Sequence, residues 1–389
     1  MKIKIKVAEL KRVMKIAGMF TERRSTILAL TMIKFTAEDR RITVSATDLD
    51  SWADICVDGE IEADGSFLLP LRRTHALLSD MPGSAEVSFS AAPDRSVKMS
   101  ISGMDMPIDI EIVALPTEDY PARLDDGDMA GVLSFKPAEL LTMFDRVRFA
   151  ISTELTRYYL NGVHWRIKDD KLISVATDGH RLAMYTSPFP IISAELSEIL
   201  QENNCIIPRG LVESLVKILP KCVDETITVS LSESKILIKC EGLTIIAKLI
   251  DGTYPDYERV IPAYVGCHPL TVNRGQLHRF ASLSSKIIKD RDYSSSVKMV
   301  AEGSSIDLEA KYYVLGHLQS RLAVSYAGKA FTMGFNPRYM AEILKALRSE
   351  NVTIHAEVEK EQSRVGALIK VTSEDDPGFL AILMPMRLP

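Results

Sequence analysis

Residues 42–48 read ITVSATD, and residues 173–178 read ISVATD. Each run joins β-branched and small residues to a closing Thr-Asp pair, a pattern typical of a strand that ends in a turn. The two runs stand about 130 residues apart, which is the length of an ordinary domain. This internal echo predicts a chain assembled from repeated copies of one unit.

Two helical patterns recur with the same period. Apolar residues at intervals of three and four predict a first amphipathic helix in each copy, over residues 7–20, 136–150 and 274–289. A proline at or just before the first turn predicts a second helix, over residues 71–80, 208–221 and 336–348. Each copy therefore has two helices, with alternating, strand-like sequence between them.

Turn-rich segments separate the copies. Residues 115–121 read LPTEDYP and residues 250–257 read IDGTYPDY, and each segment precedes a new copy. Such Pro-, Asp- and Gly-rich stretches are typical of linkers. The sequence thus predicts an α+β chain of three similar domains, with boundaries at residues 1–121, 130–254 and 264–389.

Length and composition exclude some protein classes. The chain has 389 residues, of which 25% are charged, and it carries a net charge of −5. It lacks the ~18-residue apolar run that a membrane helix needs. The first seven residues, MKIKIKV, alternate Lys with apolar residues as an amphipathic strand does, whereas a signal peptide has an unbroken apolar stretch. We therefore expect a cytoplasmic protein without a membrane partner.

The cysteines and the known chemical motifs argue against a cofactor. The five cysteines are odd in number, widely spaced and never in a C-x-x-C pair, which disfavours a disulfide framework or a zinc cluster. The usual sequence motifs of phosphate-loop, dinucleotide, zinc-protease and serine-hydrolase sites are also absent. We expect no metal and no cofactor.

Charge is distributed unevenly along the chain. Each of the six expected helices has a net positive charge, although the whole chain is acidic. Gathered on one surface, these helices would form a positive track for a phosphate backbone; singly, their Lys and Arg heads could simply be solvated. No zinc-finger, basic-zipper or RNP-like pattern accompanies the charge, so binding to DNA would be indifferent to sequence. A sequence-specific DNA-binding protein is the less favoured alternative.

The best catalytic candidate is Asp178 with His180, a carboxylate near an imidazole that could serve a hydrolase as general acid and base. However, the preceding Thr-Asp pair recurs at residues 47–48 without a histidine, which favours a turn role for it. Gly179, His180 and Arg181 belong to one copy alone and favour a partner-binding site. A hydrolase remains the alternative.

Four motifs in order resemble one family: RYYLNG at 157–162, ATDGHRLA at 176–183, YPDYERV at 254–260 and MPMRL at 384–388. The chain resembles the β sliding clamps of bacterial DNA polymerase III over its whole length. The resemblance implies three clamp domains, each with two helices packed on antiparallel sheets, assembling head-to-tail into a six-domain dimeric ring. Such a ring is a processivity factor, not an enzyme. It encircles duplex DNA and tethers the replicative polymerase, the clamp loader and repair proteins.

The resemblance also implies which basic residues approach DNA. It places Arg24, Arg72, Arg73 and Arg209 there, and charge alone adds Arg274 and Arg279. A closed ring needs no tight contact, because topology holds the DNA while screened, water-mediated contacts let the ring slide.

By the same resemblance, partner proteins insert a short linear peptide into a hydrophobic pocket between the second and third domains. Adaptable Met, Leu and Val side chains would accept the peptide, with Arg and His at the rim. The implied pocket residues are Leu160, Thr177, Gly179, His180, Arg181, Leu182, Pro255, Arg259, Val260, Asn336, Tyr339, Ile382, Met384, Pro385, Met386 and Arg387.

The expected dimer contact departs from the family pattern, in which a basic first-domain edge meets an acidic third-domain run. Here the first-domain segment 104–112 is acidic, and the third-domain segment 311–321 has no acidic residue. We expect both sides to have changed sign together. The residues predicted to meet are Ile110 and Ile112 with Ile287 and Ile288, and Asp109 or Glu111 with Lys311 or Arg321.

Overall fold

A computed structural model gives the fold of residues 1–91, 96–127, 129–190, 200, 205–240, 242–262, 268–287, 296–312, 316–356 and 368–388. The chain divides into two compact units. One comprises Met1–Ala138 with Lys217–Leu249, and the other comprises Glu139–Val216 with Ile250–Pro389. None of the helices in the described ranges is long and apolar enough to span a membrane.

The first unit contains two antiparallel sheets. The five-stranded sheet has the order β5 (Glu60–Ala63), β1 (Lys2–Lys6), β7 (Glu86–Ala91), β8 (Ser96–Ser102) and β9 (Ile108–Val113). The eight-stranded sheet has the order β10 (Ala130–Phe135), β15 (Ile227–Leu231), β16 (Lys235–Cys240), β17 (Leu243–Lys248), β4 (Ser51–Val57), β3 (Arg41–Thr47), β2 (Met32–Glu38) and β6 (Gly65–Pro70). Helices α1 (Val7–Ala17) and α2 (Leu71–Leu78) contact each other in this unit.

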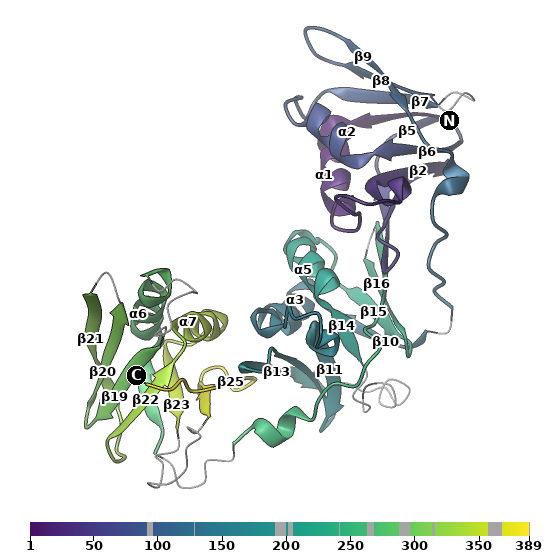
Figure 1. Ribbon diagram of the computed structural model, residues 1–389. Helices are drawn as coiled ribbons and strands as arrows, with labels where there is room; N and C mark the ends of the chain where they lie inside the picture. Colours follow the sequence, from purple (N-terminus) through teal and green to yellow (C-terminus); the bar gives the residue numbers. More distant parts are fainter. Residues whose placement is uncertain are drawn as a thin grey trace. The chain divides into compact units, whose positions relative to one another are not determined.

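The second unit contains one antiparallel sheet of twelve strands. Its order is β14 (Ile206–Pro208), β11 (Gly162–Lys168), β12 (Lys171–Thr177), β13 (Arg181–Pro190), β25 (Phe379–Leu383), β24 (Ile369–Thr372), β23 (Asn351–His355), β18 (Leu270–Asn273), β21 (Gly316–Ser325), β20 (Ser305–Tyr312), β19 (Val297–Glu302) and β22 (Phe331–Phe335). Helices α6 (Arg274–Ile287) and α7 (Pro337–Ala346) lie side by side, as Figure 1 shows.

The expected repeat is present as strand–helix pairs. In each copy a strand leads directly into a helix twice: β1 into α1 and β6 into α2, β10 into α3 (Pro137–Asp145) and β14 into α5 (Arg209–Ile218), then β18 into α6 and β22 into α7. The amphipathic pattern explains the packing, since α1 buries Val7, Leu10, Val13, Met14 and Ala17, spaced at helical intervals. The predicted α+β fold of helices on antiparallel sheets is confirmed.

Strands also pair across the copies. Within the first unit, β17 of the second copy pairs with β4 of the first, with Leu243 opposite Ile55. Within the second unit, β13 pairs with β25, with Leu182 opposite Ile382. Each copy therefore shares its sheets with the next. The exact domain boundaries stay a prediction.

The expectation that every helix is positively charged is wrong for α3. That helix ends at Asp145 and contains Glu139 and Asp145 but no basic residue. The arginines expected on it follow the helix end. Arg146 is buried and pairs with Asp376 at 2.8 Å, and Arg148 pairs with Asp145 at 2.9 Å. Their charges are neutralised within the chain.

Candidate functional site

The Thr-Asp pair forms the same turn in both copies. The Thr177 hydroxyl donates to the Arg181 carbonyl at 2.7 Å and accepts from the Gly179 amide at 3.1 Å. Asp178 Oδ1 accepts from the backbone N–H groups of His180 and Arg181 at 2.9 and 3.0 Å. In the first copy, Thr47 and Asp48 make the equivalent bonds to residues 49–51. The predicted turn is confirmed, and this turn joins β12 to β13.

Both carboxylate oxygens of Asp178 bond to groups other than the His180 imidazole. Its Oδ1 holds the turn, and its Oδ2 accepts from Arg181 Nε at 3.0 Å. The imidazole of His180 instead stacks on the Tyr339 ring, with centroids 6.4 Å apart. The two side chains are thus engaged with other groups and are not arranged as a general acid and base pair.

Arg181 is a fixed, buried wall of the site. Its guanidinium also binds Glu342 and donates to the Phe149 carbonyl at 2.5 Å. It lies over the Tyr339 ring, with Cζ 4.3 Å from the centroid. These contacts within the chain compensate the positive charge of the Arg181 guanidinium. Arg181 therefore positions neighbouring side chains and is not arranged to bind a free anion.

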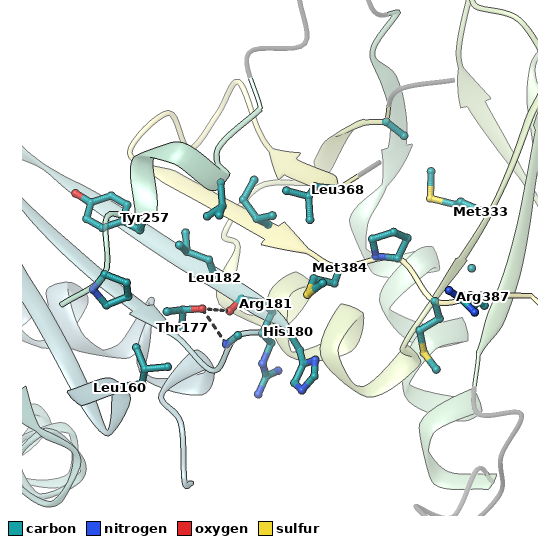
Figure 2. A pocket seen from close by; sticks show the side chains of 18 of the residues that line it. Leu160, Thr177, His180, Arg181, Leu182, Tyr257, Met333, Leu368, Met384 and Arg387 are labelled. Atoms are coloured by element: carbon teal, nitrogen blue, oxygen red, sulfur yellow. Dashed lines mark hydrogen bonds between the residues drawn. The ribbon is translucent and has the colours of Figure 1, made fainter. Parts of the chain in front are cut away.

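An apolar cavity of about 1170 Å³ opens beside this turn (Figure 2). Its walls come from the β12–β13 turn, the 3₁₀ helix Tyr257–Val260, strand β22 and the segment that follows β25. The last of these is held against β22, where the Met386 amide donates to the Gly334 carbonyl at 2.8 Å. Beneath the cavity lies a hydrophobic cluster that includes Leu160, Leu182 and Ile382. The cavity is thus a preformed apolar groove with polar groups at its rim.

The cavity contains most of the residues expected in the peptide pocket. Those that line it are Leu160, Thr177, Gly179, His180, Arg181, Leu182, Pro255, Val260, Ile382, Met384, Pro385, Met386 and Arg387. Arg259, Asn336 and Tyr339 do not. The Arg259 side chain is 84% exposed and pairs with Asp256, Asn336 caps α7, and Tyr339 lines a neighbouring cavity.

Other lining residues were not anticipated. Arg157 and Tyr257 stand inside the quoted sequence motifs, so the motifs themselves carried a signal for them. The β22 residues Phe331 and Met333 and the distant Leu368 had no such signal, because only strand pairing brings them to the cavity.

A second, polar cavity of about 680 Å³ shares His180 and Arg181 with the first. Both acidic and basic side chains line it, among them Arg148, Arg209, Glu213, Arg338, Glu342 and Lys345. Arg209 is exposed there at the start of α5. This surface places one of the expected DNA contacts close to the apolar pocket.

The other arginines expected to contact DNA differ in whether their side chains are exposed or bonded within the chain. Arg24, Arg72, Arg73 and Arg279 are exposed, and Arg72 donates to the Arg23 carbonyl at 3.4 Å. Arg274 is engaged: its Nε donates to the Ser349 carbonyl at 2.5 Å and its Nη1 to the Leu344 carbonyl at 3.2 Å. Arg274 therefore caps α7 within the fold.

The expected dimer residues lie at two sheet regions. Asp109, Ile110, Glu111 and Ile112 lie on β9, an edge strand, with the acidic residues exposed and the isoleucines half-buried. Lys311 lies on β20 and Arg321 on β21. Asp109 pairs with Lys98 at 3.2 Å and Arg321 with Asp307 at 2.5 Å, so both have partners inside the chain. Ile287 ends α6, and Ile288 lies outside the described residues.

Family models match the chain in three successive parts. They are the N-terminal domain of the DNA polymerase III beta subunit over residues 1–125, its central domain over 134–256 and its C-terminal domain over 258–387. The order of the three matches follows the three copies of the repeat.

Full-length relatives and solved structures agree. The chain is 30% identical to the beta sliding clamp of Caulobacter vibrioides with 100% of both proteins covered, and 28% identical to that of Vibrio cholerae with 94% of both covered. A Caulobacter crescentus clamp, solved with polyethylene glycol at a beta-motif tethering region, superposes with a TM-score of 0.88 at 28% identity, covering 100% of this chain and 99% of that one. A Bartonella birtlesii clamp bound to griselimycin gives a TM-score of 0.88 at 30% identity, with 100% of both chains covered. With its strand–helix repeat and its apolar pocket, the chain belongs to the DNA polymerase III beta subunit family and is a non-catalytic DNA sliding clamp.

Proposed function

We propose that this clamp acts in the cytoplasm as a head-to-tail homodimeric ring that encircles duplex DNA and holds its partner proteins through the apolar cavity beside the β12–β13 turn. The observation that carries the proposal is that cavity: about 1170 Å³ of preformed space with an apolar floor and an Arg- and His-bearing rim. Its size suits several side chains of an extended peptide.

The relatives support this use of the cavity. The Bartonella clamp binds griselimycin, and the Caulobacter clamp holds polyethylene glycol at its tethering region. Met333, Met384 and Met386 give the cavity of this chain unbranched, polarisable walls. Such walls adapt to different apolar side chains, as a site shared by several partners requires.

The ring is tested by its topology. The purified protein is first sedimented at micromolar concentration, and we expect a dimer. The protein is then loaded onto nicked circular DNA with its ATP-driven loader, and retention is measured before and after the circle is cut. A ring stays on the circle and is lost from the cut ends. A monomer that binds both DNA forms equally would contradict the proposal and favour a site-specific DNA-binding protein.

The pocket is tested separately with a fluorescent short peptide that carries the clamp-binding segment of the replicative polymerase. His180→Ala removes the ring that stacks on Tyr339 at the cavity rim. We expect it to weaken peptide binding by roughly 5- to 30-fold, about 1–2 kcal/mol, as loss of an interface anchor does. The measurement is fluorescence anisotropy.

A matched control is His268→Ala, an exposed histidine just before β18 and outside the cavity, which should bind the peptide normally. Equal binding by both variants and the unaltered protein would remove His180 from the site. Retention on circular DNA should not change in either variant, so a failure of the pocket and a failure of the ring can be told apart.

A further inference from the structure

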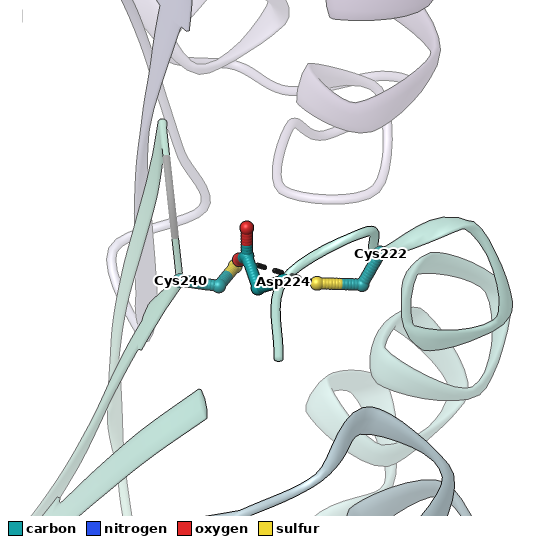
Figure 3. Close-up of side chains that lie close together, drawn as sticks. All are labelled: Cys222, Asp224 and Cys240. Carbon is teal, nitrogen blue, oxygen red and sulfur yellow. Dashed lines mark hydrogen bonds between the residues drawn. The ribbon is translucent and has the colours of Figure 1, made fainter. Parts of the chain in front are cut away.

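Two cysteines that are far apart in sequence meet in the first unit. Cys222 follows the 3₁₀ helix Leu219–Lys221, and Cys240 ends β16 at its hairpin with β17. Asp224 joins them: Cys222 Sγ lies 3.3 Å from Asp224 Oδ2, and the three ligand-type atoms all lie within 4.8 Å of one another (Figure 3). The wide sequence spacing of the cysteines had argued against any such cluster.

The backbone aims two of these side chains the same way. In the segment Cys222-Val223-Asp224, the Val223 side chain is 93% exposed, while its two neighbours are half-buried and turn toward Cys240. The alternation therefore places the thiol and the carboxylate on the same side of the segment, toward Cys240.

The spacing is close to that of a metal-binding site. Zinc binds sulfur at about 2.3 Å and carboxylate oxygen at about 2.1 Å, so tetrahedral ligands stand roughly 3.8 Å apart for two sulfurs and roughly 3.6 Å for sulfur and oxygen. The observed separations of 3.3 Å and at most 4.8 Å bracket these values. Small side-chain rotations would bring all three atoms onto one ion.

We propose that Cys222, Asp224 and Cys240 bind one zinc ion, or a cation of similar softness, with water as the fourth ligand. Two thiolates and one carboxylate select a borderline-soft divalent cation over magnesium or calcium, which prefer oxygen alone. Binding displaces the thiol protons and leaves the ion with one negative charge in excess, which the exposed side of the site and its water can solvate.

The ion would tie a loop to a hairpin. Residues 222–224 belong to the loop that connects the 3₁₀ helix to β15, and the hairpin joins β16 to β17. The same hairpin meets the first copy, because the Cys56 amide donates to the Gly242 carbonyl at 2.7 Å. Zinc would therefore strengthen the region where strands of two copies pair, by binding the folded state alone.

Cobalt is the direct probe. The full-length protein, reduced and freed of metal, is titrated with Co²⁺, whose thiolate complexes absorb in the near ultraviolet and, when tetrahedral, in the visible. We expect one Co²⁺ per chain with both absorptions, and displacement of Co²⁺ by Zn²⁺. Cys222→Ser and Cys240→Ser should each lower the affinity by more than the about 10- to 100-fold that loss of an outer-shell partner costs.

Controls separate metal binding from a loss of folding. Cys56→Ser, which removes an exposed thiol beside the same hairpin, should bind cobalt normally. Asp224→Asn keeps both sulfurs and should retain the charge-transfer band while weakening affinity. Without metal, the serine variants should unfold at the same temperature as the unaltered protein, and Zn²⁺ should raise that temperature only in proteins that keep both cysteines.

Three results would overturn the proposal. One is an unaltered protein with no thiolate–cobalt absorption. Another is absorption that survives Cys240→Ser or disappears in Cys56→Ser. The third is a Cys222–Cys240 disulfide in the isolated protein together with no metal uptake after its reduction.

Discussion

Gly179 combines two constraints at the rim of the pocket. Its φ is +85°, in the left-handed region, and a Cβ placed on it would lie 2.6 Å from Arg157 Nη1. In the first copy, Leu49 occupies the same turn position with φ +75°, so the backbone alone tolerates a side chain there. The close approach of Arg157 is what is particular to the second copy.

Gly179→Ala should therefore weaken peptide binding as well as folding. We expect it to cost about 1–2 kcal/mol of unfolding free energy, because L-residues are strained at positive φ. We also expect peptide affinity to fall roughly 5- to 10-fold as Arg157 is displaced, a change of about 1 kcal/mol. Denaturant unfolding and peptide anisotropy measure the two effects.

Gly303→Ala supplies the matched control. Gly303 has φ +57°, and a Cβ there would meet nothing within 4 Å. This variant should lose similar stability and keep full peptide affinity. If both variants bind the peptide equally well, the contact between residues 157 and 179 does not shape the pocket.

His164 is a buried imidazole that the fold keeps neutral. It is 0% exposed, stacks on the Tyr254 ring at 4.7 Å and bonds through Nδ1 to the Cys205 carbonyl at 3.2 Å. Burial, the largest cause, lowers the pKa of His164 to about 4, with the nearby Arg166 charge acting in the same direction and the hydrogen bond to the Cys205 carbonyl acting against both. The His164 imidazole therefore takes up a proton near pH 6.5 in the unfolded chain but stays neutral at that pH in the folded chain.

The sign of the pH effect follows. Above pH 6.5 the imidazole is neutral in both states, and below it only the unfolded state gains the proton until the pH approaches 4. Stability should therefore fall by up to about 1.4 kcal/mol per pH unit through that window because of this residue. His164→Phe should have a shallower fall between pH 7 and 4.5, measured by urea unfolding. Parallel pH curves for the two proteins would refute this account.

Helix α7 is closed at both ends by side chains that the sequence had suggested for other roles. At its start, Asn336 Oδ1 accepts from the backbone N–H groups of Arg338 and Tyr339 at 3.0 and 3.3 Å. At its end, Arg274 binds the Leu344 carbonyl in the last turn, and it also binds the Ser349 carbonyl just beyond the helix. Both satisfy backbone groups that a helix leaves unpaired, and the guanidinium also opposes the negative end of the helix dipole.

Arg274→Ala should destabilise the protein, because it leaves carbonyl groups at the end of α7 without their donor. We expect a loss of about 1–3 kcal/mol in unfolding free energy. Arg279→Ala, on the exposed face of the same α6, should change stability by less than about 0.5 kcal/mol. Urea unfolding distinguishes them.

Binding to DNA should show the opposite order of effects for the same two variants. Retention on circular DNA at rising salt should weaken only for Arg279→Ala, if that residue approaches the phosphates. An Arg274→Ala protein of normal stability that slides off the circle at lower salt would return Arg274 to the DNA surface.

In the proposed ring, both sides of the dimer interface have the opposite charge from the usual family pattern, with the acidic side on the first copy. Of the charged candidates, Glu111 is exposed and, within the described residues, Lys311 makes a long 3.7 Å contact with Glu309, whereas Arg321 is held by two bonds to Asp307. The pair Glu111 and Lys311 is therefore the freer one to act between two chains.

Reversal of each charge tests that pair. Glu111→Lys and Lys311→Glu should each weaken the dimer about 3- to 10-fold, and the double variant should recover most of the loss. Sedimentation velocity over a dilution series gives the dimer affinity. If the losses of dimer affinity in the two single variants simply add in the double variant, Glu111 and Lys311 do not contact each other in the assembled ring.

The molecule as a whole shows why a repeat does not imply independent domains. Strand β17 continues the sheet of the first copy and β13 continues into that of the third, so the second copy contributes to both compact units. One hydrophobic cluster also contains residues of both copies, since Trp52 of the first copy and Ile246 of the second lie opposite each other on β4 and β17. Copies joined by sheet hydrogen bonds and shared core resist separation better than copies joined by a linker alone.

The sequence by itself determined the features that depend on local pattern. Helical spacing predicted the two helices of each copy, and the repeated Thr-Asp pairs predicted turns that the hydrogen bonds confirm. These helix and turn predictions succeed because backbone propensity and short-range hydrogen bonds need no knowledge of distant strands. Most residues expected in the peptide pocket also line the cavity, but that expectation came from the family resemblance of the motifs, and their role in binding a peptide stays a prediction.

Tertiary structure alone decided which distant residues meet. Strand register brings Gly334 against Met386 and so adds β22 to the pocket, although no motif marks it. Packing ties Arg274 to the end of α7 and places Cys240 beside Cys222. Residue type shows what such side chains can bind, but their partners depend on the pairing of strands and helices far apart in the chain, which local pattern does not encode.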